Sequence, residues 1–111
     1  MSDRLLSPDL LAHPLDHAAL PAGDVSAGSP TTGVATLAGL GDVEIGVWEM
    51  SEGTARDTEV DEVFVVLAGA GTVQFEDGER LDLRPGTAVR LRAGERTTWT
   101  VTAVLRKVWI A

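Results

Sequence analysis

The chain has 111 residues, a length typical of one domain with one hydrophobic core. It contains no cysteine, which excludes disulfides, thiolate metal sites and cysteine nucleophiles. Its net charge of −8 excludes attraction to nucleic acid or anionic lipid as a mode of binding. No apolar run approaches the ~20 residues of a membrane span, and residues 1–20 lack a signal-peptide pattern, so we expect a cytoplasmic protein.

The N-terminal residues 1–33 are predicted to form an irregular arm that covers the domain or a partner, and residues 34–111 to form the domain itself. Residues 7–9, Ser-Pro-Asp, have the cap, the proline and the first-turn acid of a helix start. Pro14 would end that helix, because the residue before a proline avoids the helical conformation.

The two histidines, His13 and His17, lie four residues apart. On a helix this spacing lets two imidazoles share one metal ion. Pro14 lies between them and disfavours a regular helix, so we interpret both as exposed loop residues.

From residue 34 onward, short apolar runs alternate with turn sequences such as Asp77-Gly78, Pro85-Gly86 and Ala93-Gly94. The predicted strands cover residues 34–40, 43–50, 63–67, 72–76, 80–83, 87–91, 97–101 and 104–110. Eight short strands without a long helix predict an all-β sandwich or barrel. The strand over residues 63–67 is apolar on both faces, so both should be covered, and residues 68–71 should form the glycine turn that ends it.

The segment over residues 27–111 resembles a cupin, in particular the small single-domain cupins related to the cupin domain of ureidoglycine aminohydrolase. The resemblance rests on the runs GVWEMSEGTARDTEVDEVFVVLAGAGTV, RPGTAVRLRAGERTTWTV and LRKVWI. Glu62 and Gly69 have the spacing of the first cupin motif, and Gly86 and Gly94 that of the second. The resemblance implies a cupin-type double-stranded β-helix, or jelly-roll barrel.

The metal ligands of cupins are mostly missing from this sequence. Cupins with a metal use His-x-His, a glutamate and a later histidine. The resemblance places the three histidine positions at Arg56, Thr58 and Thr97, which leaves only Glu62. A guanidinium offers no lone pair to a metal, so we expect no transition metal at these positions.

A small-molecule cavity is the functional site that this resemblance implies. If residues 56–66 form one strand, alternate side chains share the face that points into the barrel. The candidate ligand-binding residues are Arg56, Thr58, Glu62, Phe64, Thr97, Trp99, Trp48 and Met50. An arginine among aromatic and apolar side chains suits a small molecule bearing a carboxylate or an amide. Two alternatives stay open, an ion pair between Arg56 and Glu62 and a barrel filled by its tryptophans.

Three functions fit these residues. The first is a metal-free protein that binds such a molecule. The second is an enzyme acting on ureide-like or amino-acid-like substrates, with Glu62 as general base. The third is a ligand-free structural or dimerisation barrel. A homodimer is expected because the doubly apolar strand needs a second covering surface.

Charged residues near the first motif complete the expectations. Asp57, Glu59 and Asp61 would lie on one face of an extended strand, and we interpret them as a solvated acidic edge rather than a calcium site. One of Arg106 and Lys107 should point inward beside the glutamate of the first motif, because neighbouring residues of a strand face opposite sides.

Overall fold

The computed structural model describes residues 3–111, which form β-strands and one short 3-10 helix, η1 (Ala22–Asp24). The strands are β1 (Ala18–Ala19), β2 (Val25–Gly28), β3 (Thr31–Leu40), β4 (Val43–Met50), β5 (Gly53–Thr58), β6 (Glu62–Phe75), β7 (Arg80–Leu83), β8 (Ala88–Leu91) and β9 (Arg96–Ile110). In this described range no helix is long and apolar enough to cross a membrane.

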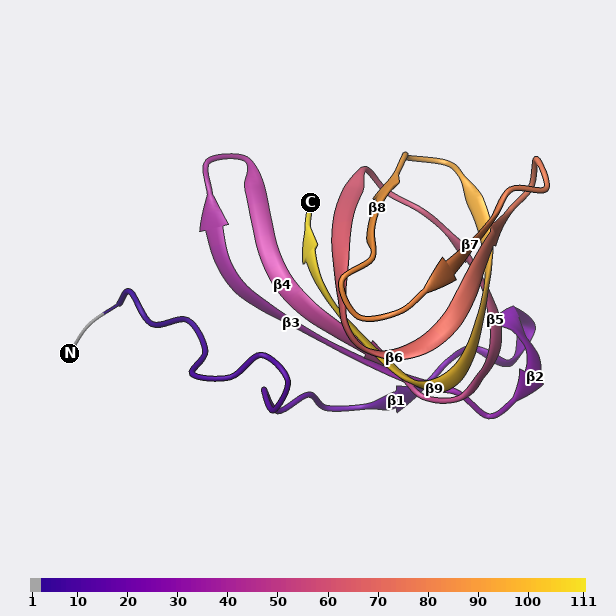
Figure 1. The fold of residues 1–111 in the computed structure, drawn as a ribbon, viewed down its shortest axis with the longest axis horizontal. Coiled ribbons are helices and arrows are strands. Elements are labelled where there is room, and N and C mark those ends of the chain that lie inside the picture. The colour runs from indigo at the N-terminus through magenta and orange to yellow at the C-terminus, as the bar shows by residue number, and fades with distance from the viewer. Residues whose placement is uncertain (1–2) are drawn as a thin grey trace.

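The strands form one curled antiparallel sheet around the two longest strands, β6 and β9 (Figure 1). One edge of β9 pairs with β6, and its other edge pairs with β4 and then β5. β7 and β8 extend the sheet beyond β6, while β3 lies outside β4 and β2 outside β5. The predicted all-β barrel is therefore confirmed.

The hydrophobic core lies inside the curl of the sheet. Its side chains alternate along each strand with exposed ones, the period-2 pattern of strands with one buried face. The largest fully buried apolar side chains of this core are Phe64, Met50, Leu91, Leu105, Val66 and Val73, and Trp99 and Phe75 are nearly as buried. This core continues on one side into a cavity, described below, whose walls carry the polar groups.

The two central strands are longer than predicted. Residues 68–71 do not form a turn; they continue β6 through a series of register shifts against β9. Gly69, at φ 92°, lies against the carbonyl group of Val104, where no side chain would fit. Likewise residues 97–101 and 104–110 belong to a single strand, β9. Close backbone approach, rather than a chain reversal, explains the glycines.

The segment over residues 56–66 is not one strand, contrary to the assumption behind the predicted cavity lining. β5 ends at Thr58, residues 59–61 form a short connection, and β6 begins at Glu62. β5 and β6 pair with opposite edges of β9. The connection changes which side chains face the interior, so Ala55 is buried whereas Arg56 is exposed.

The N-terminal arm contributes β1, which pairs with β3, and β2, which pairs with β5. The helix predicted to begin at residues 7–9 is absent, and residues 10–12 form a single turn instead. Six residues before Pro14 give too few hydrogen bonds to offset the cost of helix nucleation.

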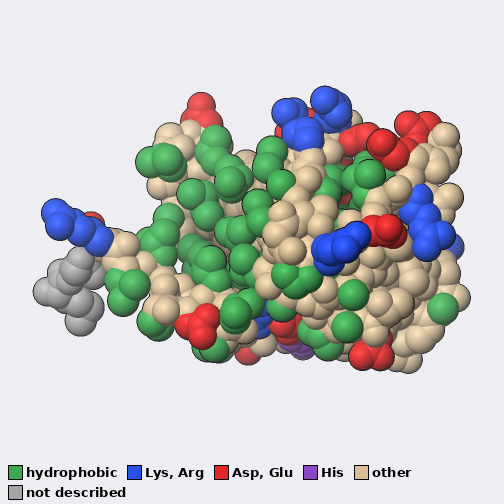
Figure 2. Space-filling view, viewed as in Figure 1, with side chains coloured by type: hydrophobic (Ala, Val, Ile, Leu, Met, Phe, Trp, Pro, Cys, Tyr) green, Lys and Arg blue, Asp and Glu red, His purple; other side chains and the backbone are tan. Residues whose placement is uncertain are grey.

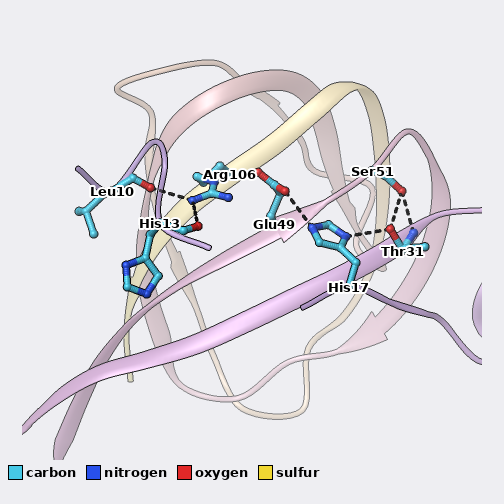
Figure 3. Close-up of polar contacts among 7 residues, drawn as sticks. All are labelled: Leu10, His13, His17, Thr31, Glu49, Ser51 and Arg106. Carbon is cyan, nitrogen blue, oxygen red and sulfur yellow. Dashed lines mark hydrogen bonds and ion pairs between the residues drawn. The ribbon is translucent and has the colours of Figure 1, made fainter. Parts of the chain in front are cut away.

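One cluster of polar contacts holds the arm against the sheet (Figure 3). The guanidinium of Arg106 donates to the carbonyl oxygens of Leu10 and His13, both at 2.8 Å, and to Glu49 Oε2 at 2.8 Å. His17 lies between Thr31 Oγ1 and Glu49 Oε1, at 2.8 Å from each. Burial raises the pKa of Glu49, but hydrogen bonds from Arg106 and His17 outweigh it and lower that pKa overall.

Candidate functional site

A cavity of about 460 Å³ opens beside the core, between β4, β5, β9 and the arm. Six of the eight predicted binding residues line it, namely Trp48, Met50, Arg56, Thr58, Glu62 and Trp99. The arm adds Leu20 and Asp24, and the connection after β5 adds Glu59 and Val60. Asp57 of β5, Lys107 and Trp109 of β9, and the following Ala111 also line the cavity. The walls therefore combine indole rings with carboxyl groups, the pattern of a small polar ligand site.

Lys107 is the cation inside this cavity. Its side chain is buried, and its Nζ donates to Glu62 Oε2 at 2.7 Å. The same Nζ lies 4.7, 4.3 and 4.9 Å from the ring centroids of Trp48, Phe64 and Trp99. A carboxylate and three rings thus stabilise one ammonium group. Of the two cations near the end of the chain, Lys107 is therefore the one that points inward beside Glu62.

Glu59 is the carboxyl group that the sequence interpretation misplaced. It is not part of a solvated edge, because it is only 7% exposed. Its Oε2 accepts hydrogen bonds from Thr97 Oγ1 at 2.5 Å and from Trp99 Nε1 at 3.0 Å. Its backbone is fixed by two hydrogen bonds to the turn at residues 94–95. A buried, rigidly held carboxyl group therefore lines the cavity.

Arg56 does not supply the predicted inward guanidinium. It is exposed and donates to Ser26 Oγ at 3.0 Å and to the carbonyl oxygen of Gly23 at 2.5 Å. It therefore ties β5 to the arm at the rim of the cavity. The alternative ion pair between Arg56 and Glu62 is also absent, because Glu62 pairs with Lys107.

The other predicted residues divide between rim, wall and core. Thr58 is exposed at the rim, and Trp48 is a half-buried wall. Phe64 is fully buried beneath the Lys107 ammonium, and Thr97 is buried beside Glu59; neither lines the cavity.

Trp109 was expected only as a possible core residue, yet it lines the cavity. Its ring lies close to Gly46, where a side chain would collide with the indole. Its buried Nε1 has no hydrogen-bond acceptor within the described residues. No local sequence pattern indicates this wall, because it depends on the pairing of a glycine on β4 with a tryptophan on β9 in the folded sheet.

Two carboxyl groups of the cavity have raised pKa values. Burial raises the pKa of Glu59, and the nearby Asp57 raises it further, although hydrogen bonds from Thr97 and Trp99 act in the opposite direction. Partial desolvation raises the pKa of Asp57 although the residue is solvent-exposed, with smaller contributions in the same direction from Asp24 and Glu62. Both groups lack a neighbouring cation that fully offsets their desolvation.

The residues at the cupin ligand positions do not fit a transition metal. Arg56 is protonated and points outward, Thr58 and Thr97 offer only hydroxyl groups, and Glu62 is engaged by an ammonium. Within residues 3–111, no group of three or more His, Cys, Asp or Glu side chains is arranged to hold a metal ion.

The curled antiparallel barrel, with a cavity beside the residues of the first cupin motif, defines the class of the protein as a cupin. The model of the EutQ-like cupin domain matches residues 37–109, and the chain belongs to this family. The match is to the EutQ-like cupin family and gives no support for the ureidoglycine aminohydrolase family in particular. No curated protein sequence matches the chain.

Solved structures agree with this fold. The EutQ protein of Clostridium difficile is 21% identical, with a TM-score of 0.65 over 83% of this chain and 73% of that one. A protein of unknown function from Rhizobium leguminosarum is 26% identical, with a TM-score of 0.65 over 71% and 78%.

A protein of the DUF861 family from Pseudomonas syringae, also of unknown function, is 21% identical, with a TM-score of 0.77 over 92% of this chain. The match covers only 45% of that longer protein. The two likenesses at 21% identity show the fold alone.

Proposed function

We propose that the cavity binds a small organic molecule bearing an amide or a carboxylate, without a transition metal. The observation that carries this proposal is the buried ammonium of Lys107 in the cavity wall. An ammonium has three N–H donors, and one of them goes to Glu62. The others can donate to a ligand oxygen, while the indoles of Trp48 and Trp109 cover the apolar part of the ligand.

Titration with propionamide and propionate, followed through the indole N–H signals of the tryptophans by NMR, tests this proposal. Saturable shifts of the Trp48 and Trp109 signals are expected, unchanged after dialysis against EDTA. The double variant Lys107→Met/Glu62→Gln, which removes the cation without leaving a charge behind, should lose the response. Arg80→Met, which lies outside the cavity, should retain it. Absence of saturable shifts rejects the proposal, and loss with EDTA rejects its metal-free part.

An enzyme acting on ureide-like or amino-acid-like molecules is the alternative, and one observation favours it. Burial raises the pKa of Glu59, and a cavity carboxyl group with a raised pKa is a candidate for general acid–base catalysis. Glu62, the general base expected from the sequence, is instead paired with Lys107. Ammonia release from ureidoglycine that is lost in Glu59→Gln would support the enzyme, and equal release with and without protein would reject it.

We also propose that a second copy of the chain covers an apolar patch on the outer face of the sheet. By the strand register, Leu40 pairs with Val43, and Ile110 pairs with Val63, all on the face opposite the buried Phe64. Their exposed fractions are 73%, 39%, 42% and 39%. Figure 2 shows hydrophobic side chains gathered where β3, β4 and the end of β9 lie. Such a contiguous patch is typical of an interface.

A second copy suits this patch because the four residues that form it carry no charge, whereas the chain has a net charge of −8. Two copies can therefore approach there with least repulsion, in the self-complementary arrangement of a two-fold dimer. Sedimentation velocity should give a dimer mass, and Leu40→Glu should give a monomer. Val104→Glu, at an exposed position outside the patch, should remain dimeric. A monomeric unmodified chain, or dimers for all three proteins, would reject this interface.

A further inference from the structure

We infer that the ligand of this cavity also carries a positively charged amino group, which lies against Glu59 and Asp57. The ligand class is then small amino amides and amino acids. This inference rests on the proposed binding function and names the part of the ligand that the carboxyl-lined wall would recognise.

The charges around the cavity are unbalanced in a direction that suits a cation. Six ionisable side chains line it, and they comprise the carboxyl groups of Asp24, Asp57, Glu59 and Glu62 and the cations Arg56 and Lys107. Lys107 is already paired with Glu62, and Arg56 donates to neutral oxygens of the arm. Among the described residues, Asp24, Asp57 and Glu59 form no ion pair.

Glu59 offers a free carboxyl oxygen at a fixed place. The residue is 93% buried, since only 7% of it is exposed, and it lines the cavity. Its Oε2 receives both side-chain hydrogen bonds, and in the described part of the chain no hydrogen bond reaches Oε1. Among the described residues, Trp109 Nε1 is the one fully buried side-chain polar atom without a partner, so Glu59 Oε1 retains access to solvent. A ligand N–H in the cavity can therefore donate to this oxygen in a charge-assisted hydrogen bond.

The same cavity shows how the fold holds an ammonium group. Lys107 Nζ lies against one carboxylate and three aromatic rings, at 4.3 to 4.9 Å from their centroids. Glu59, Trp48 and Trp109 line the same cavity, so a ligand there can meet a carboxyl group and indole rings together. An organic ammonium gains from both components through charge-assisted hydrogen bonding and cation–π attraction.

A metal ion is not the cation that these carboxyl groups suit. A divalent ion requires several oxygen ligands converging on one point at 2.0–2.6 Å. Across residues 3–111, no such group of three acidic or histidine side chains occurs. Carboxyl groups spread around an indole-walled cavity match a larger, partly apolar cation.

A comparison of glycinamide with propionamide tests the inference, because the two molecules differ only by an ammonium in place of a methyl group. We expect glycinamide to bind at least about tenfold more tightly in the NMR titration, the change produced by ~1.4 kcal/mol of added interaction. Glycine compared with propionate should show the same order. Equal or tighter binding of propionamide overturns the inference while leaving the binding function intact. Absence of binding by all four molecules overturns both.

Variants locate the ammonium site. Glu59→Gln should reduce the affinity for glycinamide to about the affinity for propionamide, while propionamide binding persists. If Glu59→Gln fails to fold, Asp57→Asn, at an exposed position on the same wall, should reduce the preference severalfold. Glu52→Gln, an exposed acid outside the cavity, should leave it unchanged. A preference that survives both wall variants overturns the assignment to Glu59 and Asp57.

Discussion

Lys107 is the residue on which the interior electrostatics depend, because its charge and that of Glu62 are buried together. Replacing Lys107 with Met should lower the free energy of unfolding by roughly 3–5 kcal/mol, the usual cost of leaving one partner of a buried ion pair unpaired. The double variant Lys107→Met/Glu62→Gln should recover most of that loss. Urea unfolding of the two variants measures the difference.

An exposed cation provides the control for this prediction. Arg84 lies on the surface, so Arg84→Met should change the free energy of unfolding by less than ~0.5 kcal/mol. If Lys107→Met alone were as well tolerated as Arg84→Met, the buried pair would contribute little to stability.

Glu59 gives the cavity a pH dependence whose sign follows from its burial. Because burial raises its folded-state pKa above the ordinary value of 4.5, its proton is held more tightly in the folded state. The resulting stability is present below the unfolded-state pKa and is lost as pH rises through the folded-state pKa. Glu59→Gln has no such proton, so its stability relative to the unmodified protein should improve as pH rises from about 4 to about 7.

Unfolding by urea at several pH values checks this prediction. The glutamine can still accept hydrogen bonds from Thr97 and Trp99, so the comparison isolates ionisation. A stability difference that is constant across the range would show that Glu59 titrates alike in the folded and unfolded chains.

At the scale of elements, the contact between β6 and β9 depends on a glycine. A side chain at Gly69 would meet the carbonyl group of Val104, and its φ of 92° is itself strained for other residues. Gly94 has a similar φ of 85° but open space around it. Gly94→Ala should therefore cost only the conformational strain, about 1–3 kcal/mol.

Gly69→Ala adds a backbone collision to that strain. We expect it to cost at least ~2 kcal/mol more than Gly94→Ala in thermal or urea unfolding, as substitutions that displace packed backbone do. Equal losses for the two variants would mean that β6 and β9 separate easily at this point.

The arm is the second element whose attachment can be tested. Because hydrogen bonds from Arg106 and His17 lower the folded-state pKa of Glu49 despite burial, the carboxylate contributes stability above its unfolded-state pKa. That contribution is lost as pH falls through the folded-state pKa. Glu49→Gln should therefore loosen the arm at neutral pH, and the difference from the unmodified chain should shrink in acid.

Amide NMR signals of residues 10–17 report this loosening directly. Glu52→Gln is the matched control, because Glu52 is an exposed acid in the connection between β4 and β5, three residues after Glu49. Arm signals that are the same in Glu49→Gln and the unmodified chain would show that Arg106 and the β1 pairing hold the arm without the carboxylate.

Local turn chemistry made much of this fold predictable. Asp77-Gly78, Pro85-Gly86 and Ala93-Gly94 are turns as expected, because their conformations depend on the residues themselves. Gly69 and Gly71 depend instead on distant carbonyl groups, those of Val104 and Thr100, which no local pattern reveals. The sequence therefore predicted the strands better than their lengths.

The candidate site was less predictable because side-chain direction depends on strand boundaries. The three-residue connection at 59–61 turns Arg56 outward and buries Glu59, the reverse of the expectation from an uninterrupted strand. The register of β9 against β6 and β4 then decides that Lys107, rather than Arg106, joins Glu62. Cupin motif spacing located the cavity region, and tertiary pairing determined its charges.

At the scale of the whole molecule, shape and charge together bear on association. The chain measures 46 × 25 × 25 Å, and the β3–β4 hairpin projects from the barrel (Figure 1). Two residues of the outer apolar patch, Leu40 and Val43, lie on this projecting hairpin, and the other two, Val63 and Ile110, lie on β6 and β9. The molecule that carries the patch has a net charge of −8. Burial of this patch favours the proposed dimer, and repulsion between two acidic copies opposes it.

This opposition gives the dimer a salt dependence of definite sign. Raising NaCl from about 0.05 M to about 0.5 M shortens the range of charge repulsion to a few ångströms, so the dimer dissociation constant should fall severalfold. Sedimentation equilibrium at both salt concentrations measures the change. A dissociation constant that rises with salt would mean that attraction between opposite charges holds the copies together. The interface would then lie on a charged surface of the barrel rather than on the apolar patch.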